Sequence, residues 1–237
     1  KLARARSEQF GAVLPLLERT ARLTQLNRLA GRLGQAQTWC AELLQLVRHA
    51  QDPIELLKYH TQQSILYSYC NEPERAQEHL AQLANRNDIP RTRRDESLAR
   101  AYLELFSKKK PEVEGLAVGG LDTLLALELE QVRMFARQVS PARLLRVSRG
   151  AFPVFQSAAL RLSGKLEEAL QIARKHDFPL EEGLALAALS RKRSQPELLH
   201  MARAALERSQ MPSPLVEKML TRNVLEGHFG GQGGSGS

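Results

Sequence analysis

The feature that most constrains the fold is a helix-start signal that recurs along the chain. The strings DPIE from Asp52, NEPE from Asn71 and SQPE from Ser194 each place a short polar residue ahead of proline and a glutamate three residues later. In this pattern the polar side chain and the returning carboxylate satisfy backbone N–H groups that the first turn of a helix leaves without partners. Ser140 and Ser213, each followed by proline, mark two further starts. These signals predict many helices with short connections.

Between the starts, apolar residues recur every three or four positions, as on one face of a helix. Leu166, Ala169, Leu170 and Ala173 are one example. Aromatic residues make up only 5% of the chain, and runs of β-branched residues that alternate with polar ones are missing. We therefore expect an all-α chain of antiparallel helix pairs. Pro15 leaves open a break in the first helix. The expected helices cover roughly residues 5–30, 34–49, 53–69, 73–85, 92–107, 120–137, 141–148, 153–162, 165–175, 180–191, 195–208 and 213–226.

The domain organisation follows from two stretches of unusual composition. Residues 107–120, SKKKPEVEGLAVGG, combine a charge run with proline and glycines and are the longest expected irregular connection. We expect N-terminal helical repeats over 1–110, a connection over 111–120 and C-terminal repeats over 121–228. Residues 229–237 are Gly/Ser-rich after Phe229 and are expected to be a flexible linker or tag.

Small residues at matching positions indicate a helical repeat. Ser64 is a small residue in one expected first helix, Tyr67 follows it, and Ala76 lies in the second helix. Gly164 stands at another turn and Ala169 in the helix after it. These residues resemble the tetratricopeptide (TPR) pattern of helix pairs. The resemblance implies a TPR-like superhelix, an α-solenoid, in which Ser64, Ala76, Gly164 and Ala169 allow close helix packing.

The repeat departs from the regular pattern. Ala36 precedes Ala76 by 40 residues, and Ala76 precedes Ala169 by 93, so the array is degenerate. The strings LSGKLEEALQIARKHDFPLEEGLALAALSRKR and LLHMARAALERSQMPSPLVEKML also resemble the helical repeats of multidomain signalling ATPases and transcriptional regulators. The second of these contains Met201, Ala202, Ala205 and Leu206 as its apolar positions. This resemblance implies a sensor or scaffold segment.

No catalytic constellation is visible in the sequence. Phosphate-binding and dinucleotide-binding glycine motifs are absent, and the six histidines show no metal-ligand spacing. Cys40 and Cys70 form no metal motif and are expected to be buried free thiols of a reducing, cytoplasmic compartment. No apolar stretch reaches membrane-spanning length. We expect a protein that is no enzyme, holds no cofactor or metal, and has no membrane partner.

Two functions remain open. The first is an interaction module that binds a protein, a peptide or a small effector on the concave face of a solenoid. Its candidate residues are His60, Gln63, Tyr67, Arg91, Arg93 and Arg94. Tyr67 also suits packing, and the arginines could simply pair with the acids that follow them. The second is a nucleic-acid binder, suggested by the net charge of +8 but weakened by the scarcity of aromatic residues. A third reading is a spacer between domains.

Overall fold

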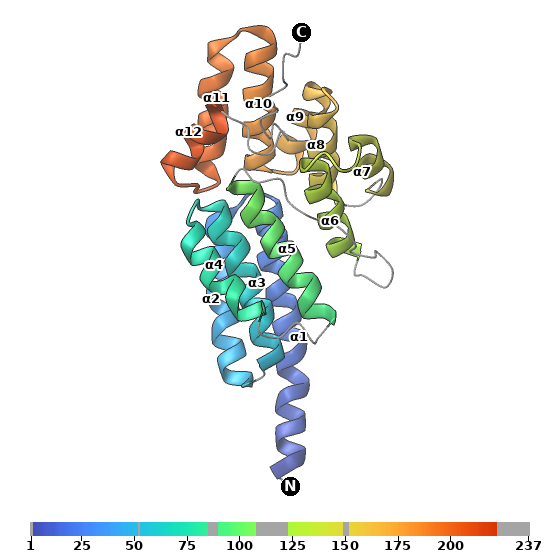
Figure 1. Ribbon diagram of the computed structural model, residues 1–237, viewed down its shortest axis with the longest axis vertical. Helices are drawn as coiled ribbons and strands as arrows, with labels where there is room; N and C mark the ends of the chain where they lie inside the picture. The colour runs from blue at the N-terminus through green and yellow to red at the C-terminus, as the bar shows by residue number, and fades with distance from the viewer. Residues whose placement is uncertain (1, 52, 85–89, 108–122, 149–151, 222–237) are drawn as a thin grey trace, which may run out of the picture.

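The computed structural model describes residues 2–51, 53–84, 90–107, 123–148 and 152–221. Over these residues the chain forms twelve α-helices and no strand, which confirms the expected all-α class. Figure 1 shows them in two groups: α1 to α5 form an N-terminal group, and α6 to α12 a C-terminal group. The helices are α1 (Leu2–Leu29), α2 (Leu33–Ala50), α3 (Pro53–Tyr69), α4 (Pro73–Ala84), α5 (Pro90–Phe106), α6 (Thr123–Phe135), α7 (Pro141–Val147), α8 (Pro153–Leu162), α9 (Leu166–Lys175), α10 (Pro179–Arg193), α11 (Pro196–Arg208) and α12 (Ser213–Thr221).

Helices pack against their sequence neighbours and against the next helix but one. In the N-terminal group α1 contacts α2 and α3, and α3 also contacts α4 and α5. In the C-terminal group α8 contacts α6 and α10, and α10 also contacts α12. Within each group, alternate helices therefore contact one another as well as the helices that lie between them in the sequence.

The turns within the pairs share one backbone geometry. Gly31, Asn71 and Gly164 all have positive φ, between 60° and 78°. The residue after each donates its N–H to the carbonyl five positions back, which is a common way to close a helix C-terminus. Asn71 and Ser194 were expected to cap the following helices. They instead take left-handed φ values of 60° and 54° and end the preceding ones.

A repeated contact closes two of the pairs. The Ser64 hydroxyl donates to the Ala76 carbonyl at 2.9 Å, and the Ser157 hydroxyl donates to the Ala169 carbonyl at 3.0 Å. All four residues are fully buried. A serine side chain of one helix thus reaches the backbone of the next, so each pair of helices approaches closely at these small residues.

Gly31 shows why the two groups fit together at the first turn. A Cβ atom on Gly31 would lie 2.3 Å from the Leu180 Cβ at the start of α10, and its φ is +75°. The neighbouring Leu33 N–H donates to the Ser209 carbonyl at 3.1 Å. The first turn of the N-terminal group therefore rests directly on α10 and on the turn that follows α11.

A buried ion pair also joins the groups. Arg28 of α1 and Glu128 of α6 are both fully buried, and Arg28 Nη2 lies 2.7 Å from Glu128 Oε1. The Gln25 amide donates to the other Glu128 oxygen at 2.6 Å. The Arg28 guanidinium lies 5.2 Å from the centre of the Tyr102 ring of α5. Sequence patterning had not indicated this contact between distant segments.

The remaining expectations concern Pro15, two segments of unusual composition and membrane-spanning helices. Pro15 lies inside α1, which continues from Leu2 to Leu29 without a break. The expected connection at 111–120 and the tail at 229–237 lie outside the described residues. A bilayer-spanning helix, which needs about 20 mostly apolar residues, does not occur in the described part of the chain.

Candidate functional site

The candidate residues on α3 lie against α4. His60 Nδ1 and His79 Nδ1 are 2.9 Å apart, so one imidazole donates a hydrogen bond to the other. The Tyr67 ring stacks on His79 with 5.5 Å between ring centres, and the Arg75 guanidinium lies 4.1 Å from the centre of the Tyr67 ring. Because these four half-buried or exposed side chains contact one another, we name them the aromatic seam.

Burial keeps the imidazoles of the aromatic seam neutral. Burial, together with a smaller effect of the nearby His79, lowers the pKa of His60 to about 4. The pKa of His79 is also lowered, mainly by burial and additionally by Arg75, although Glu78 opposes this shift. Within the described residues, no group of three or more His, Cys, Asp or Glu side chains could hold a metal ion. The two imidazoles are therefore neutral at neutral pH and paired with each other, and Arg75 is the one charged member of the aromatic seam.

The other candidates are less concentrated. Gln63 is half-buried, and a hydrogen bond links it to Tyr59, whose ring lies edge-on to both histidines of the aromatic seam. Arg93 is exposed and Arg94 half-buried near the start of α5, and each already has an interaction partner. The Arg91 side chain lies outside the described residues.

Cys40 and Cys70 are free and buried, and neither is set up as a nucleophile. Burial raises the pKa of the Cys40 thiol to about 12. It also raises the pKa of Cys70, which accepts a hydrogen bond from the Gln37 amide at 3.4 Å. Both thiols are therefore protonated at neutral pH and act as small apolar groups.

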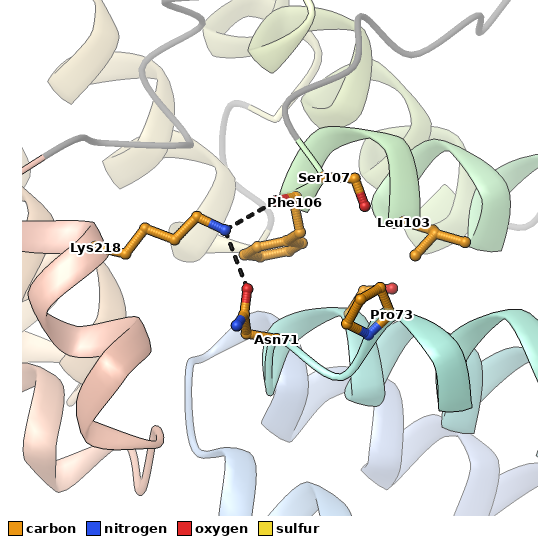
Figure 2. Close-up of a pocket in the computed structure, with 7 residues that line it drawn as sticks. Asn71, Pro73, Leu103, Phe106, Ser107 and Lys218 are labelled. Carbon is orange, nitrogen blue, oxygen red and sulfur yellow. Dashed lines mark hydrogen bonds between the residues drawn. The ribbon is translucent and has the colours of Figure 1, made fainter.

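A pocket of about 340 Å³ lies where α12 meets the N-terminal group (Figure 2). The Lys218 ammonium donates to the Asn71 side-chain oxygen at 3.1 Å and to the Phe106 carbonyl at 3.0 Å. Pro73 and Leu103 line the opposite side. Lys218 of α12 is thus bound by the turn after α3 and by α5, so the pocket is a junction between the two groups.

The C-terminal group contains a different kind of surface, an open groove between α9 and α11 with α10 as its floor. Its volume is about 390 Å³. Met201 of α11 is 46% exposed there, and Leu170 and Leu198 are half-buried. Leu186 and Leu189 of α10 form the floor. We call this surface, with Glu167, Gln171, Arg174 and Arg193 at its edges, the apolar groove.

Sequence analysis did not identify the apolar groove. It assigned Met201 to the same apolar set as Ala202, Ala205 and Leu206, but only the last three are buried. The apolar residues of α11 cover more of the helix surface than α10 alone could bury, and this excess could have indicated the groove. Leu198, Leu199 and Met201 add a second apolar stripe to α11 beyond the face that α10 covers, and Leu199 is 38% exposed.

The positive charge of the chain is neutralised locally at many sites. Exposed or half-exposed arginines lie in ion pairs with carboxylates: Arg32 with Asp177, Arg75 with Glu72, Arg143 with Glu130, Arg193 with Glu167, and Arg203 with Glu217. Nucleic-acid binding usually needs a stripe of basic side chains that remain available to phosphates. These pairs make the net charge a weak indication of such a surface.

Comparisons of the chain with protein-family models, with curated proteins and with solved structures gave no match. Neither the tetratricopeptide-like pattern nor the resemblance to repeats of signalling ATPases is therefore supported by a matched relative. The function of the chain has to be inferred from the geometry of its own residues.

Proposed function

We propose that the chain is a non-enzymatic, TPR-like helical-repeat module that binds another protein through its apolar groove. The packing of every other helix against the next of its kind supports a solenoid arrangement. The matching hydrogen bonds of Ser64 to Ala76 and of Ser157 to Ala169 support a common repeat unit. A role as a sensor or scaffold in a larger signalling or transcription-regulating protein rests on the sequence resemblance alone.

The observation that carries the proposal is a group of neighbouring apolar side chains in the apolar groove, of which Met201 is exposed and Leu170 and Leu198 are half-buried. Met201 stands 46% exposed beside half-buried Leu170 and Leu198, over a leucine floor. Contiguous exposed apolar surface costs free energy in water and typically marks a protein contact. Methionine suits such a surface because its unbranched side chain adapts to different partners.

The aromatic seam is a poorer docking surface. Its imidazoles, Tyr67 and Arg75 already contact each other. A partner would have to displace these contacts before it gained its own. The apolar groove requires no such exchange.

The experiment that tests the proposal places a photo-crosslinking amino acid at Met201 in cells that express the protein. A matched probe replaces Gln77, which is exposed on α4 of the other group. Proteins that crosslink only through position 201 are identified, purified and measured for binding to the wild type and to Met201→Glu. We expect binding to weaken at least tenfold in Met201→Glu while the melting temperature stays unchanged. Equal binding to both proteins would contradict the proposal.

A further inference from the structure

The two histidines of the aromatic seam bring a pair of ring nitrogens together between neighbouring helices. His60 of α3 and His79 of α4 place their Nδ1 atoms 2.9 Å apart, with 5.1 Å between the ring centres. Both side chains are half-buried, so each keeps part of its surface in contact with solvent. The hydrogen bond from Ser64 to Ala76 joins the same two helices, so this distance is set by helix packing and not by a loop.

The protonation of the two rings suits metal binding. Burial lowers the pKa of both His60 and His79, so both are neutral at neutral pH. A neutral imidazole is the commonest metal ligand among protein side chains. In the present hydrogen bond one Nδ1 carries a proton and the other accepts it. Moving that proton to Nε2 of the same ring frees both Nδ1 lone pairs without changing the charge of either ring.

The distance between the two nitrogens favours one coordination geometry. Histidine nitrogens lie about 2.0–2.1 Å from a bound metal ion such as zinc. At that bond length, two neighbouring ligands are about 2.9 Å apart around a square-planar or octahedral ion and about 3.3 Å apart around a tetrahedral one. The observed Nδ1–Nδ1 distance of 2.9 Å matches the first case. Cu²⁺ prefers tetragonal surroundings of nitrogen and oxygen, and it binds such ligands most tightly among the common divalent ions.

The charged side chains around the pair act in opposite directions. Glu78 raises the pKa of His79 and Arg75 lowers it. By the same Coulomb forces a cation at His79 is attracted by Glu78 and repelled by Arg75. Arg75 also pairs with Glu72 at 2.8 Å, which weakens the repulsion.

From this geometry we infer that His60 and His79 form a two-histidine binding site for a divalent copper ion, with water molecules as the other ligands. Within the described residues no third His, Cys, Asp or Glu side chain joins the pair. The site is therefore open to solvent ligands and differs from a closed structural metal centre. It lies on α3 and α4 and is independent of the function proposed for the apolar groove on α9, α10 and α11.

Titration of the whole, untagged protein with CuSO₄ tests the inference. Isothermal titration calorimetry measures the affinity, and electron paramagnetic resonance counts the nitrogens bound to the ion. The variants are His60→Gln, His79→Gln and His200→Gln. His200 is exposed on α11 and is the matched control. The melting temperature of each variant without metal shows whether it is folded.

Two further variants keep both histidines and test where the ion lies. Arg75→Gln removes the repelling charge and should tighten copper binding about threefold at low salt, because an exposed charge has a modest effect. Glu78→Gln removes the attracting charge and should weaken binding by about the same factor. These variants decide the question if a histidine variant fails to fold.

We expect the wild type and His200→Gln to bind one copper ion through two nitrogens. His60→Gln and His79→Gln should bind it at least about tenfold more weakly. Equal affinity in all four proteins would show an adventitious ion only and would overturn the inference. A copper signal from a single nitrogen, or affinities that do not change in Arg75→Gln and Glu78→Gln, would overturn it as well.

Discussion

The outer surfaces of α3 and α10 occupy the same place in their helix groups but are built in opposite ways. α3 packs against α2 and α4, and α10 packs against α9 and α11. The left-handed turn residues are Asn71 after α3 and Ser194 after α10. Eight residues before them, α3 carries Gln63 and α10 carries Leu186. Four residues after the turn, α4 carries Arg75 and α11 carries Leu198. The first surface is polar and internally paired, whereas the second is apolar and open.

The two helix pairs have the same turn geometry but carry different side chains beside the turn. The side chains therefore determine whether the surface is covered by internal contacts or leaves apolar groups exposed. In the aromatic seam, hydrogen-bonding and stacking groups find partners across α3 and α4. In the apolar groove, Met201 is 46% exposed and Leu170 and Leu198 are half-buried. The four predictions below test the shared geometry first and the difference in filling afterwards.

The largest effect is expected at two buried arginines that stand three residues before a turn glycine. Arg28 pairs with Glu128 of the other group, and Arg161 pairs with Glu181, at 2.9 Å, within its own group. Arg28→Met or Arg161→Met leaves a buried carboxylate without its cation, which typically costs about 3–5 kcal/mol. Urea denaturation measures this cost.

The matched control for each arginine variant removes the carboxylate as well. Arg161→Met with Glu181→Leu should recover most of the stability, because no buried charge is left unpaired. Arg28→Met should also separate the unfolding of the two groups, since Arg28 joins them. A loss below about 1 kcal/mol in both single variants would show that these pairs do not hold the helices as described.

A smaller loss is expected where the helix pairs approach most closely. Ala76 and Ala169 are fully buried, and each accepts a hydrogen bond from a serine of the preceding helix. Ala76→Leu and Ala169→Leu should each overpack their contact and cost about 1–3 kcal/mol. The matched controls Gln77→Leu and Gln171→Leu, at exposed positions of the same two helices, should change the melting temperature little. If only one of the two alanine variants is destabilised, the two pairs are not equivalent.

The sequence predicted the all-α class and most helix boundaries because these depend on local signals. Proline after a short polar residue and apolar spacing of three or four act within one or two turns. The prediction that Asn71 and Ser194 cap the helices that follow them was nevertheless wrong. Asparagine and serine can cap a following helix or end a preceding one, and both residues have positive φ in the structure.

The long-range contacts could not be predicted for a different reason. Arg28 and Glu128 are separated by 100 residues, and neither local spacing nor composition distinguishes them from exposed charged residues. The contact of His60 with His79 depends on how α3 and α4 rotate against each other. Met201 belongs to an apolar pattern, and only the packing of α10 reveals which side of α11 is left open.

The third prediction compares the filled and open surfaces directly. Tyr67→Ala removes a half-buried ring that stacks on His79, and should cost about 1–2 kcal/mol. Met201→Ser removes an exposed side chain and should stay within about 0.5 kcal/mol of the wild type. Thermal and urea unfolding of both variants measure the difference. Similar losses in the two variants would mean that the apolar groove is not open in solution.

The smallest effect is a pH dependence that belongs to the aromatic seam alone. Burial and His79 lower the pKa of His60 to about 4, below the ordinary 6.5. Between these two values the unfolded chain binds the proton and the folded chain does not, so stability falls as the pH falls from about 6.5 toward 4. His60→Gln should flatten this part of the curve of melting temperature against pH, whereas His200→Gln, at an exposed histidine, should not. The residues that line the apolar groove include no histidine. If His200→Gln flattens the curve and His60→Gln does not, the pH dependence does not come from the aromatic seam, and the prediction is wrong.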